Sequence, residues 1–209
     1  MLKRRQYDVI FEWGLKLLAL GTLGYFTVRA SLMYAQNPSR ITLLLAIISE
    51  CATLVLVLVA KRPQTRDWYL PAVVATIFAV CIYPLCVDVT PGVNLFSEQI
   101  GSAIQGLGIL WSLHAKISIG NNFGLLPAHR GIVRKGPYRF VRHPMYFGYL
   151  ITHIGFLGAN FHVQNLVILG ILYAMQLYRI HREERALSAS PEYAEYRQVV
   201  RYRLIYGLY

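Results

Sequence analysis

Apolar stretches close to twenty residues long recur along this chain, and short polar segments separate them. An α-helix needs about 20 mainly apolar residues to cross the roughly 30 Å hydrocarbon layer of a bilayer. Inside that layer a helix satisfies its own backbone hydrogen bonds, which water cannot do there. The pattern predicts six membrane-spanning helices, at residues 10–28, 41–60, 70–87, 97–117, 145–158 and 163–182.

The composition agrees with an integral membrane protein. Hydrophobic residues make up 56% of the 209 residues and charged residues only 15%. The chain is therefore more apolar than a soluble domain with one core. No repeat, low-complexity tract or Ser/Gly-rich linker divides the chain. We therefore expect one all-α membrane domain over residues 1–209. Residues 1–118 would supply the first spans, and residues 119–209 a polar loop, a hairpin of the last two spans and a tail.

The distribution of Lys and Arg predicts how this domain lies in the membrane. Of the 21 cationic residues, 18 fall at the N-terminus, in the second and fourth connections, or in the tail. In the third connection, "VDVTPGVNLFSE", the only charged residues are acidic. Because cytoplasmic loops retain positive charge, both termini are predicted to be cytoplasmic. The net charge of +11 then faces anionic lipid headgroups, and no nucleic-acid-binding signature accompanies it.

The fourth connection is unusual in its backbone. "GNNFGLLPAHRGIVRKGPYRFVRHP", residues 120–144, has too many glycines and prolines for a continuous helix. Either it is an ordinary cytoplasmic loop, or its free N–H and C=O groups bind a ligand. At its end Pro144 fits the first turn of a helix, which leaves free N–H groups beside His143 that favour an anion.

Three further side chains carry charge in or near the spans. Arg179 and Glu183 are four residues apart and therefore lie on one helix face. Two interpretations are open: the pair is an exposed ion pair, or both side chains are functional groups. The helix is leaving lipid at this point, where charges are costly, which favours function. Glu50 lies in the middle of the second span. It is either a functional group or a protonated carboxyl that is hydrogen-bonded to a neighbouring helix.

Metal chemistry finds no support in the pattern. The three cysteines lie inside apolar stretches without C-x-x-C spacing, and the six histidines form no H-x-x-x-H cluster. We expect no metal site, and this excludes membrane di-iron oxygenases.

Three motifs at the C-terminal end give a resemblance to a known family. "GPYRFVRHPMYFG" is followed, after about thirty apolar residues, by "RIHREERAL" and then by "EYAEYR". Together they resemble the isoprenylcysteine carboxyl methyltransferase family over residues 120–209. The resemblance implies a membrane methyltransferase that uses S-adenosylmethionine. Its methyl acceptor would be the carboxylate of an isoprenylated cysteine, or a similar lipophilic molecule, that enters from the bilayer.

The resemblance also implies roles for individual residues. Arg179 would be the catalytic and substrate-binding residue that faces the acceptor. The residues implied to enclose the cofactor are Arg130, Gly131, Ile132, Val133, Tyr138, His143, Pro144, Met145, Tyr146 and Glu183. Methyl transfer to an ionised carboxylate needs no general base, so alignment supplies most of the acceleration. An arginine can hold a carboxylate through two parallel hydrogen bonds.

Other functions stay open at this point. One alternative keeps the cofactor and changes the acceptor to a phospholipid amine or a small N- or S-nucleophile. Another is an NADPH oxidoreductase like the membrane sterol reductases, which are similar in the final loop and hairpin. A third is a membrane scaffold without enzymatic activity. Binding of S-adenosylmethionine separates the methyltransferases from the other two classes.

Overall fold

The computed structural model describes residues 2–59, 69–120 and 132–209, and their regular structure is helical. A single β-bridge, between Val93 and Phe161, is the one strand-like pairing within these ranges. The α-helices are α1 (Leu2–Gln36), α2 (Ile41–Val59), α3 (Leu70–Ile77), α4 (Tyr83–Cys86), α5 (Glu98–Ile119), α6 (Pro144–Ala159), α7 (Val163–Leu187) and α8 (Pro191–Val199). The predicted all-α class is therefore confirmed for the described part of the chain.

Each predicted span corresponds to helix, but the helices differ in how well they suit a membrane. By length and composition, α7 is the one helix among the described residues that is long and apolar enough to cross a bilayer. Two shorter apolar segments, Ile41–Val55 and Val73–Cys86, lie in α2 and in α3 to α4. The number of crossings stays a prediction from the sequence.

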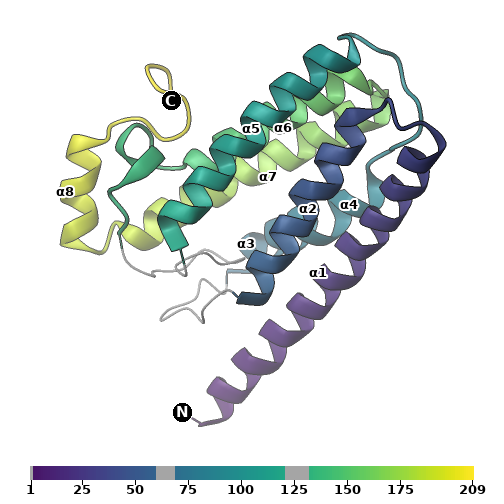
Figure 1. Ribbon diagram of the computed structural model, residues 1–209. Helices are drawn as coiled ribbons and strands as arrows, with labels where there is room; N and C mark the ends of the chain where they lie inside the picture. The colour runs from purple at the N-terminus through teal and green to yellow at the C-terminus, as the bar shows by residue number, and fades with distance from the viewer. Residues whose placement is uncertain (1, 60–68, 121–131) are drawn as a thin grey trace.

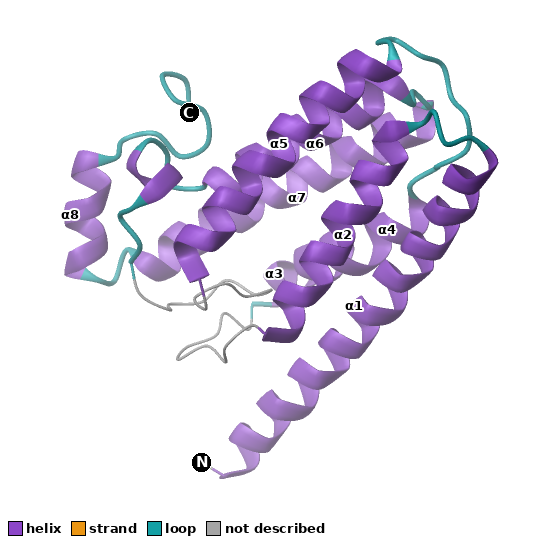
Figure 2. Ribbon diagram, in the orientation of Figure 1, coloured by secondary structure: helices purple, strands orange, loops and turns teal. Residues whose placement is uncertain are grey.

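The long helical segments from α1 to α7 run in alternating directions, with α3 and α4 together forming one segment (Figure 1). The connections 37–40, 87–97 and 160–162 lie together at one end of the bundle, while α6 begins and α5 and α7 end at the other. We call this second end the site end. Helix α1 packs on α2, α2 on α5 and α5 on α6, while α3 lies against α7. The short helix α8 stands apart, beside the loop that precedes α6 (Figure 2).

The third predicted span is interrupted by a π-helical turn, Phe78–Ile82, between α3 and α4. Pro84 follows it and has no N–H to donate to the carbonyl of Val80, four residues earlier. The hydroxyl of Thr22 on α1 instead donates to this carbonyl at 3.3 Å. A neighbouring helix thus places a donor beside the backbone group that the proline leaves free, although the same hydroxyl also lies 3.0 Å from the carbonyl of Leu18 on its own helix.

At the end opposite the site end, buried polar contacts fix the connections. The Arg40 guanidinium donates to the carbonyl of Val89 at 2.9 Å and to Oδ1 of Asn160 at 2.5 Å. The Glu98 carboxylate accepts from the backbone N–H and the hydroxyl of Thr42, at 2.6 and 2.7 Å. These bonds join the start of α2 to the 87–97 segment, to α5 and to the end of α6.

Helix α6 packs most closely on α5, although the sequence led us to expect its partner in α7. Glycines explain the close packing, because a Cβ atom on Gly101 would lie 2.9 Å from the carbonyl oxygen of Gly155, and one on Gly108 would lie 2.7 Å from that of Gly148. Small residues at such positions let two membrane helices approach closely. Helices α6 and α7 are consecutive, joined by residues 160–162, but they touch less extensively.

This interface gives a prediction with a matched control on the same helix. Gly108→Ala places a methyl group against the backbone of α6 and should destabilise the protein by about 1–3 kcal/mol. Gly106→Ala, two residues away, meets no atom within 4 Å and should be neutral or slightly stabilising. Thermal unfolding in detergent measures both. Equal melting temperatures for the two variants would contradict the close α5–α6 contact.

Candidate functional site

A cavity of about 210 Å³ opens at the site end and continues between the helices. Of the ten residues predicted to hold the cofactor, seven line it: Ile132, Val133, Tyr138, His143, Met145, Tyr146 and Glu183. The predicted acceptor residue, Arg179, lines it as well. Pro144 starts α6 and is not part of the lining; its carbonyl accepts from the indole N–H of Trp111 at 3.1 Å. Arg130 and Gly131 fall outside the described residues.

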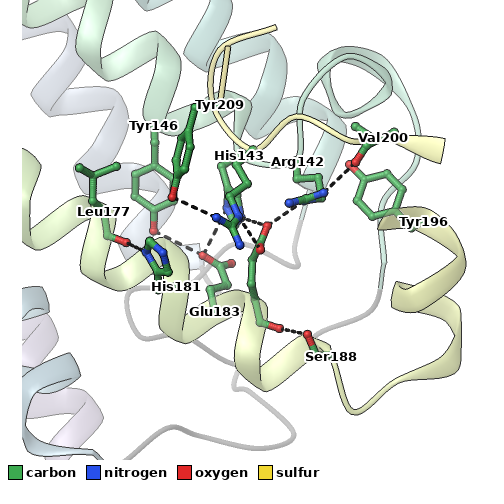
Figure 3. Close-up of polar contacts among 12 residues, drawn as sticks. Arg142, His143, Tyr146, Leu177, His181, Glu183, Ser188, Tyr196, Val200 and Tyr209 are labelled. Carbon is green, nitrogen blue, oxygen red and sulfur yellow. Dashed lines mark hydrogen bonds and ion pairs between the residues drawn. The ribbon is translucent and has the colours of Figure 1, made fainter. Parts of the chain in front are cut away.

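The start of α6 faces the last turns of α7. Pro144 occupies the first turn of α6, so that His143 and Tyr146 reach toward Glu183 (Figure 3). The Tyr146 hydroxyl donates to Oε2 of Glu183 at 3.5 Å, and Nδ1 of His143 lies 3.8 Å from the same oxygen. The Glu183 side chain keeps 29% of its surface exposed, so a bound molecule can still reach its carboxylate.

The neighbouring Glu184 has a different role, which the sequence reading missed. Its carboxylate is 6% exposed and accepts from Nε of Arg142 at 2.7 Å and from Nε of Arg203 at 2.8 Å. His143 approaches it as well, with Nε2 at 3.4 Å from Oε1. Consecutive residues on an α-helix point about 100° apart. Glu183 therefore faces the cavity while Glu184 faces the loop and the tail.

These contacts lower the pKa of the Glu184 carboxyl. Burial by itself would raise this pKa, but His143, Arg142 and Arg203 outweigh burial and bring it well below the ordinary value of 4.5. Glu184 lies beyond residue 182, where the predicted span ends. Its partners Arg142 and His143 belong to the loop before α6, and Arg203 belongs to the tail. The carboxylate is ionised throughout the neutral range and acts as a fixed anchor for the guanidinium groups of Arg142 and Arg203.

Arg142 extends this anchor to the C-terminal tail. Its guanidinium donates through Nη1 to the carbonyl of Val200 at 2.9 Å (Figure 3) and to that of Arg201 at 2.9 Å. The backbone N–H of Arg142 donates to the carbonyl of Tyr202, and that of His143 donates to the carbonyl of Arg203. The tail thereby closes over the loop that precedes α6, and it fixes the orientation of His143.

Arg179 lies one turn earlier on α7 than Glu183, about 6 Å further from the site end. It is 8% exposed and donates to Oε1 of Gln176 at 3.3 Å. Its guanidinium lies over the ring of Tyr146, with Cζ 5.7 Å from the ring centre. Tyr146 thus contacts Arg179 through its ring and Glu183 through its hydroxyl, so the two predicted functional groups share one wall of the cavity.

Tyr138 offers a further polar group. It is 6% exposed, and its carbonyl accepts from the hydroxyl of Tyr196 on α8 at 2.7 Å. Its own buried hydroxyl has no hydrogen-bond partner in the part of the chain that the structure describes. Burial raises the pKa of this phenol above its ordinary value, so the group stays a hydrogen-bond donor. A buried donor of this kind costs stability unless a ligand pairs with it.

Metal ligands do not gather near the cavity. Across the described ranges, no three His, Cys, Asp or Glu residues lie close enough together to hold a metal ion.

Comparison with known families agrees with this geometry. Residues 98–189 match the model of the isoprenylcysteine carboxyl methyltransferase (ICMT) family, so the family predicted from the sequence is confirmed. The match covers α5, the loop before α6, α6 and α7, which together carry Tyr138, His143, Tyr146, Arg179 and Glu183. No curated protein matches the chain significantly.

Proposed function

Because residues 98–189 belong to the isoprenylcysteine carboxyl methyltransferase family of membrane methyltransferases, we propose a specific reaction for this protein. It transfers the methyl group of S-adenosylmethionine to the carboxylate of an isoprenylated cysteine or a similarly lipophilic acceptor. One observation carries this proposal: Glu183 and Arg179 line a single cavity and both contact Tyr146.

The residues nearest the site end suit the cofactor. S-adenosylmethionine, when bound, supplies an electrophilic methyl group on a sulfonium, together with ammonium, hydroxyl and amine donors. Glu183 accepts hydrogen bonds from such donors, and the unpaired hydroxyl of Tyr138 donates one in return. The backbone N–H of His143 donates to the carbonyl of Arg203, which fixes the backbone at this wall of the compartment. The residues present therefore fit the group that the family implies.

The residues deeper in the bundle suit the acceptor. A carboxylate is already ionised at neutral pH, so the transfer needs alignment and no proton acceptor. Arg179 can hold both carboxylate oxygens with its planar guanidinium. Stacking on Tyr146 limits the rotation of this guanidinium and thus the direction in which the carboxylate points. The nucleophilic oxygen would then approach the cofactor compartment from the bilayer side.

The proposed topology places the two reactants on the correct sides. We propose a multi-pass membrane protein with both termini in the cytoplasm, on the basis of the asymmetric distribution of Lys and Arg. The site end then faces the cytoplasm, where the water-soluble cofactor is available. The lipophilic acceptor enters from the bilayer, between the helices, and meets the cofactor at Arg179.

Glu183 provides the test of the cofactor compartment. Glu183→Ala removes a hydrogen-bonded anion and should weaken S-adenosylmethionine binding about tenfold or more, the equivalent of one charge-assisted hydrogen bond. Isothermal titration calorimetry on the purified protein measures this. Glu192→Ala on α8 serves as the control, because Glu192 is an exposed carboxylate outside the cavity lining. Equal affinity of Glu183→Ala and wild type for S-adenosylmethionine would show that Glu183 does not bind the cofactor.

A further inference from the structure

The cavity does not end at Arg179. It continues between α2, α4, α5 and α6, where Glu50, Tyr83, Gln105 and His153 are part of its lining. His153 lies seven residues beyond Tyr146 on α6, which places it about 10 Å further into the bundle. Polar side chains at this depth of a membrane protein are costly, and they usually mark a functional site.

Two of these side chains present hydrogen-bond acceptors to the cavity. Gln105 is only 1% exposed, and within the described part of the chain its Oε1 atom accepts no hydrogen bond. The carboxyl group of Glu50 lines the same space, and none of the hydrogen bonds or ion pairs seen among the described residues involves it. A buried acceptor without a partner costs free energy, which a ligand that donates a hydrogen bond would recover.

The other two side chains are Tyr83 and His153, and contacts with neighbouring rings fix the position of the His153 imidazole. Nδ1 of His153 is hydrogen-bonded to the hydroxyl of Tyr173 on α7 at 2.7 Å. The imidazole also lies against the ring of Tyr83, with ring centres 5.2 Å apart. This arrangement occupies one ring nitrogen of His153 and fixes the position of the imidazole. The polar groups therefore form a defined pocket, which we call the inner pocket (Glu50, Tyr83, Gln105 and His153).

The surroundings of the inner pocket indicate the kind of molecule it takes. Apolar side chains line the cavity around it, including Leu23, Phe26, Phe156 and Leu172. Nearby Lys116 is buried, donates to the hydroxyl of Thr53 at 3.3 Å and interacts electrostatically with Glu50. Since a protein cation already faces Glu50, the pocket suits an uncharged donor better than an ammonium group. A hydroxyl on an otherwise apolar chain meets both conditions.

We propose that the inner pocket binds a hydroxyl group carried on the apolar chain of the methyl acceptor, about 10 Å from the methylated end. The proposal rests on the proposed function, because it assumes that the acceptor's reactive end lies at Arg179. A site built to hydrogen-bond a substrate hydroxyl discriminates against the analogue that lacks it, since its own polar groups then stay unpaired. The inner pocket is thus a specificity site for a hydroxylated lipid.

The test compares S-farnesylcysteine analogues that carry no hydroxyl with analogues hydroxylated at successive positions along the chain. Binding is measured as the rise in melting temperature of the purified protein in detergent, which requires no turnover. At least one hydroxylated analogue should bind wild type about tenfold more tightly than its parent. In Gln105→Leu and in Glu50→Leu, each of which removes an acceptor, this preference should fall to threefold or less. Gln99→Leu, an exposed position at the start of α5, should keep it.

Methylation of the same analogues is recorded in parallel, so that the two proposals can fail separately. A preference for a hydroxylated analogue without methylation would support the inner pocket and contradict the carboxyl methyltransferase proposal. Equal binding of all analogues to wild type, no binding of any, or a preference that survives in both Gln105→Leu and Glu50→Leu would overturn the inner-pocket proposal.

Discussion

Arg179→Lys should slow methylation of a carboxylate acceptor roughly ten- to a hundredfold and leave the affinity for S-adenosylmethionine unchanged. Lysine keeps the positive charge but loses the planar fork that aligns both carboxylate oxygens. The loss of one charge-assisted hydrogen bond in the transition state, about 1.5–3 kcal/mol, corresponds to this decrease in rate. Steady-state turnover and calorimetry measure the two effects. Arg185→Lys, at an exposed position on the same helix, is the matched control and should behave as wild type.

Arg179→Ala distinguishes a carboxylate acceptor from an amine acceptor. With a carboxylate, this variant should bind the cofactor normally and lose methylation. With a phospholipid amine, a nearby guanidinium would disfavour the protonated amine, so its removal should be neutral or helpful. Retained activity in Arg179→Ala would contradict the carboxylate acceptor, and loss of cofactor binding would contradict the separation between Arg179 and the cofactor compartment.

Glu184→Ala should destabilise the protein by about 3 kcal/mol, because it leaves the buried Arg142 without its carboxylate. For a chain of this size that loss lowers the melting temperature by about 6–12 °C. Removal of a partner from a buried ion pair costs more than the pair itself contributes, since an uncompensated charge stays behind. Glu192→Ala, which removes an exposed carboxylate, should change the melting temperature little. Similar melting temperatures for the two variants would contradict the anchor role of Glu184.

The same group predicts how stability depends on pH. The pKa of Glu184 is lower in the folded protein than the ordinary value of 4.5, so its contribution to stability is complete above that value. This contribution is lost as the pH falls below about 4.5, because the carboxylate must then be protonated beside the guanidinium groups of Arg142 and Arg203. Melting temperatures of wild type should therefore fall more steeply with acidification than those of Glu184→Gln. Parallel curves would contradict this assignment.

The positions of the helices could be predicted from local features of the sequence. Helix α5 begins at Glu98, next to the predicted residue 97, because the Ser97 hydroxyl caps it by accepting from the N–H of Ile100. Helix α2 begins at Ile41 as predicted. The 35-residue α1 is longer than its predicted span at both ends, since hydropathy marks the apolar part of a helix and polar turns continue it.

Helix pairing was harder to predict than helix position. Gly101 and Gly108 on α5, and Gly148 and Gly155 on α6, are each seven residues apart and could have indicated a close contact. The seven-residue spacing places each pair on one helix face, but it does not say which other helix that face meets. The short connection at 160–162 favoured α7 as the partner of α6, whereas the glycines bring α6 closest to α5.

Recognition of the family motifs identified residues that line the cavity near the site end, but not the residues that support them. Arg142 and Arg203 are 61 residues apart in sequence, and their meeting at Glu184 depends on the path of the tail. No local pattern shows which of the adjacent Glu183 and Glu184 faces the cavity, because the rotation of α7 decides it. In the inner pocket Glu50 was noticeable as a charge within a span, while the uncharged Gln105 gave no such signal.

Methylation of the carboxylate of a lipophilic acceptor by S-adenosylmethionine is the reaction that we propose for this protein. Its most direct test incubates the purified protein in detergent with methyl-labelled cofactor and a mixture of S-farnesylcysteine, S-geranylgeranylcysteine and phospholipids. Mass spectrometry and mild alkaline hydrolysis then locate the label. We predict label in a prenylcysteine methyl ester that releases methanol in alkali. Label in an alkali-stable amine product, or a cofactor left unconsumed beside every acceptor, would contradict it.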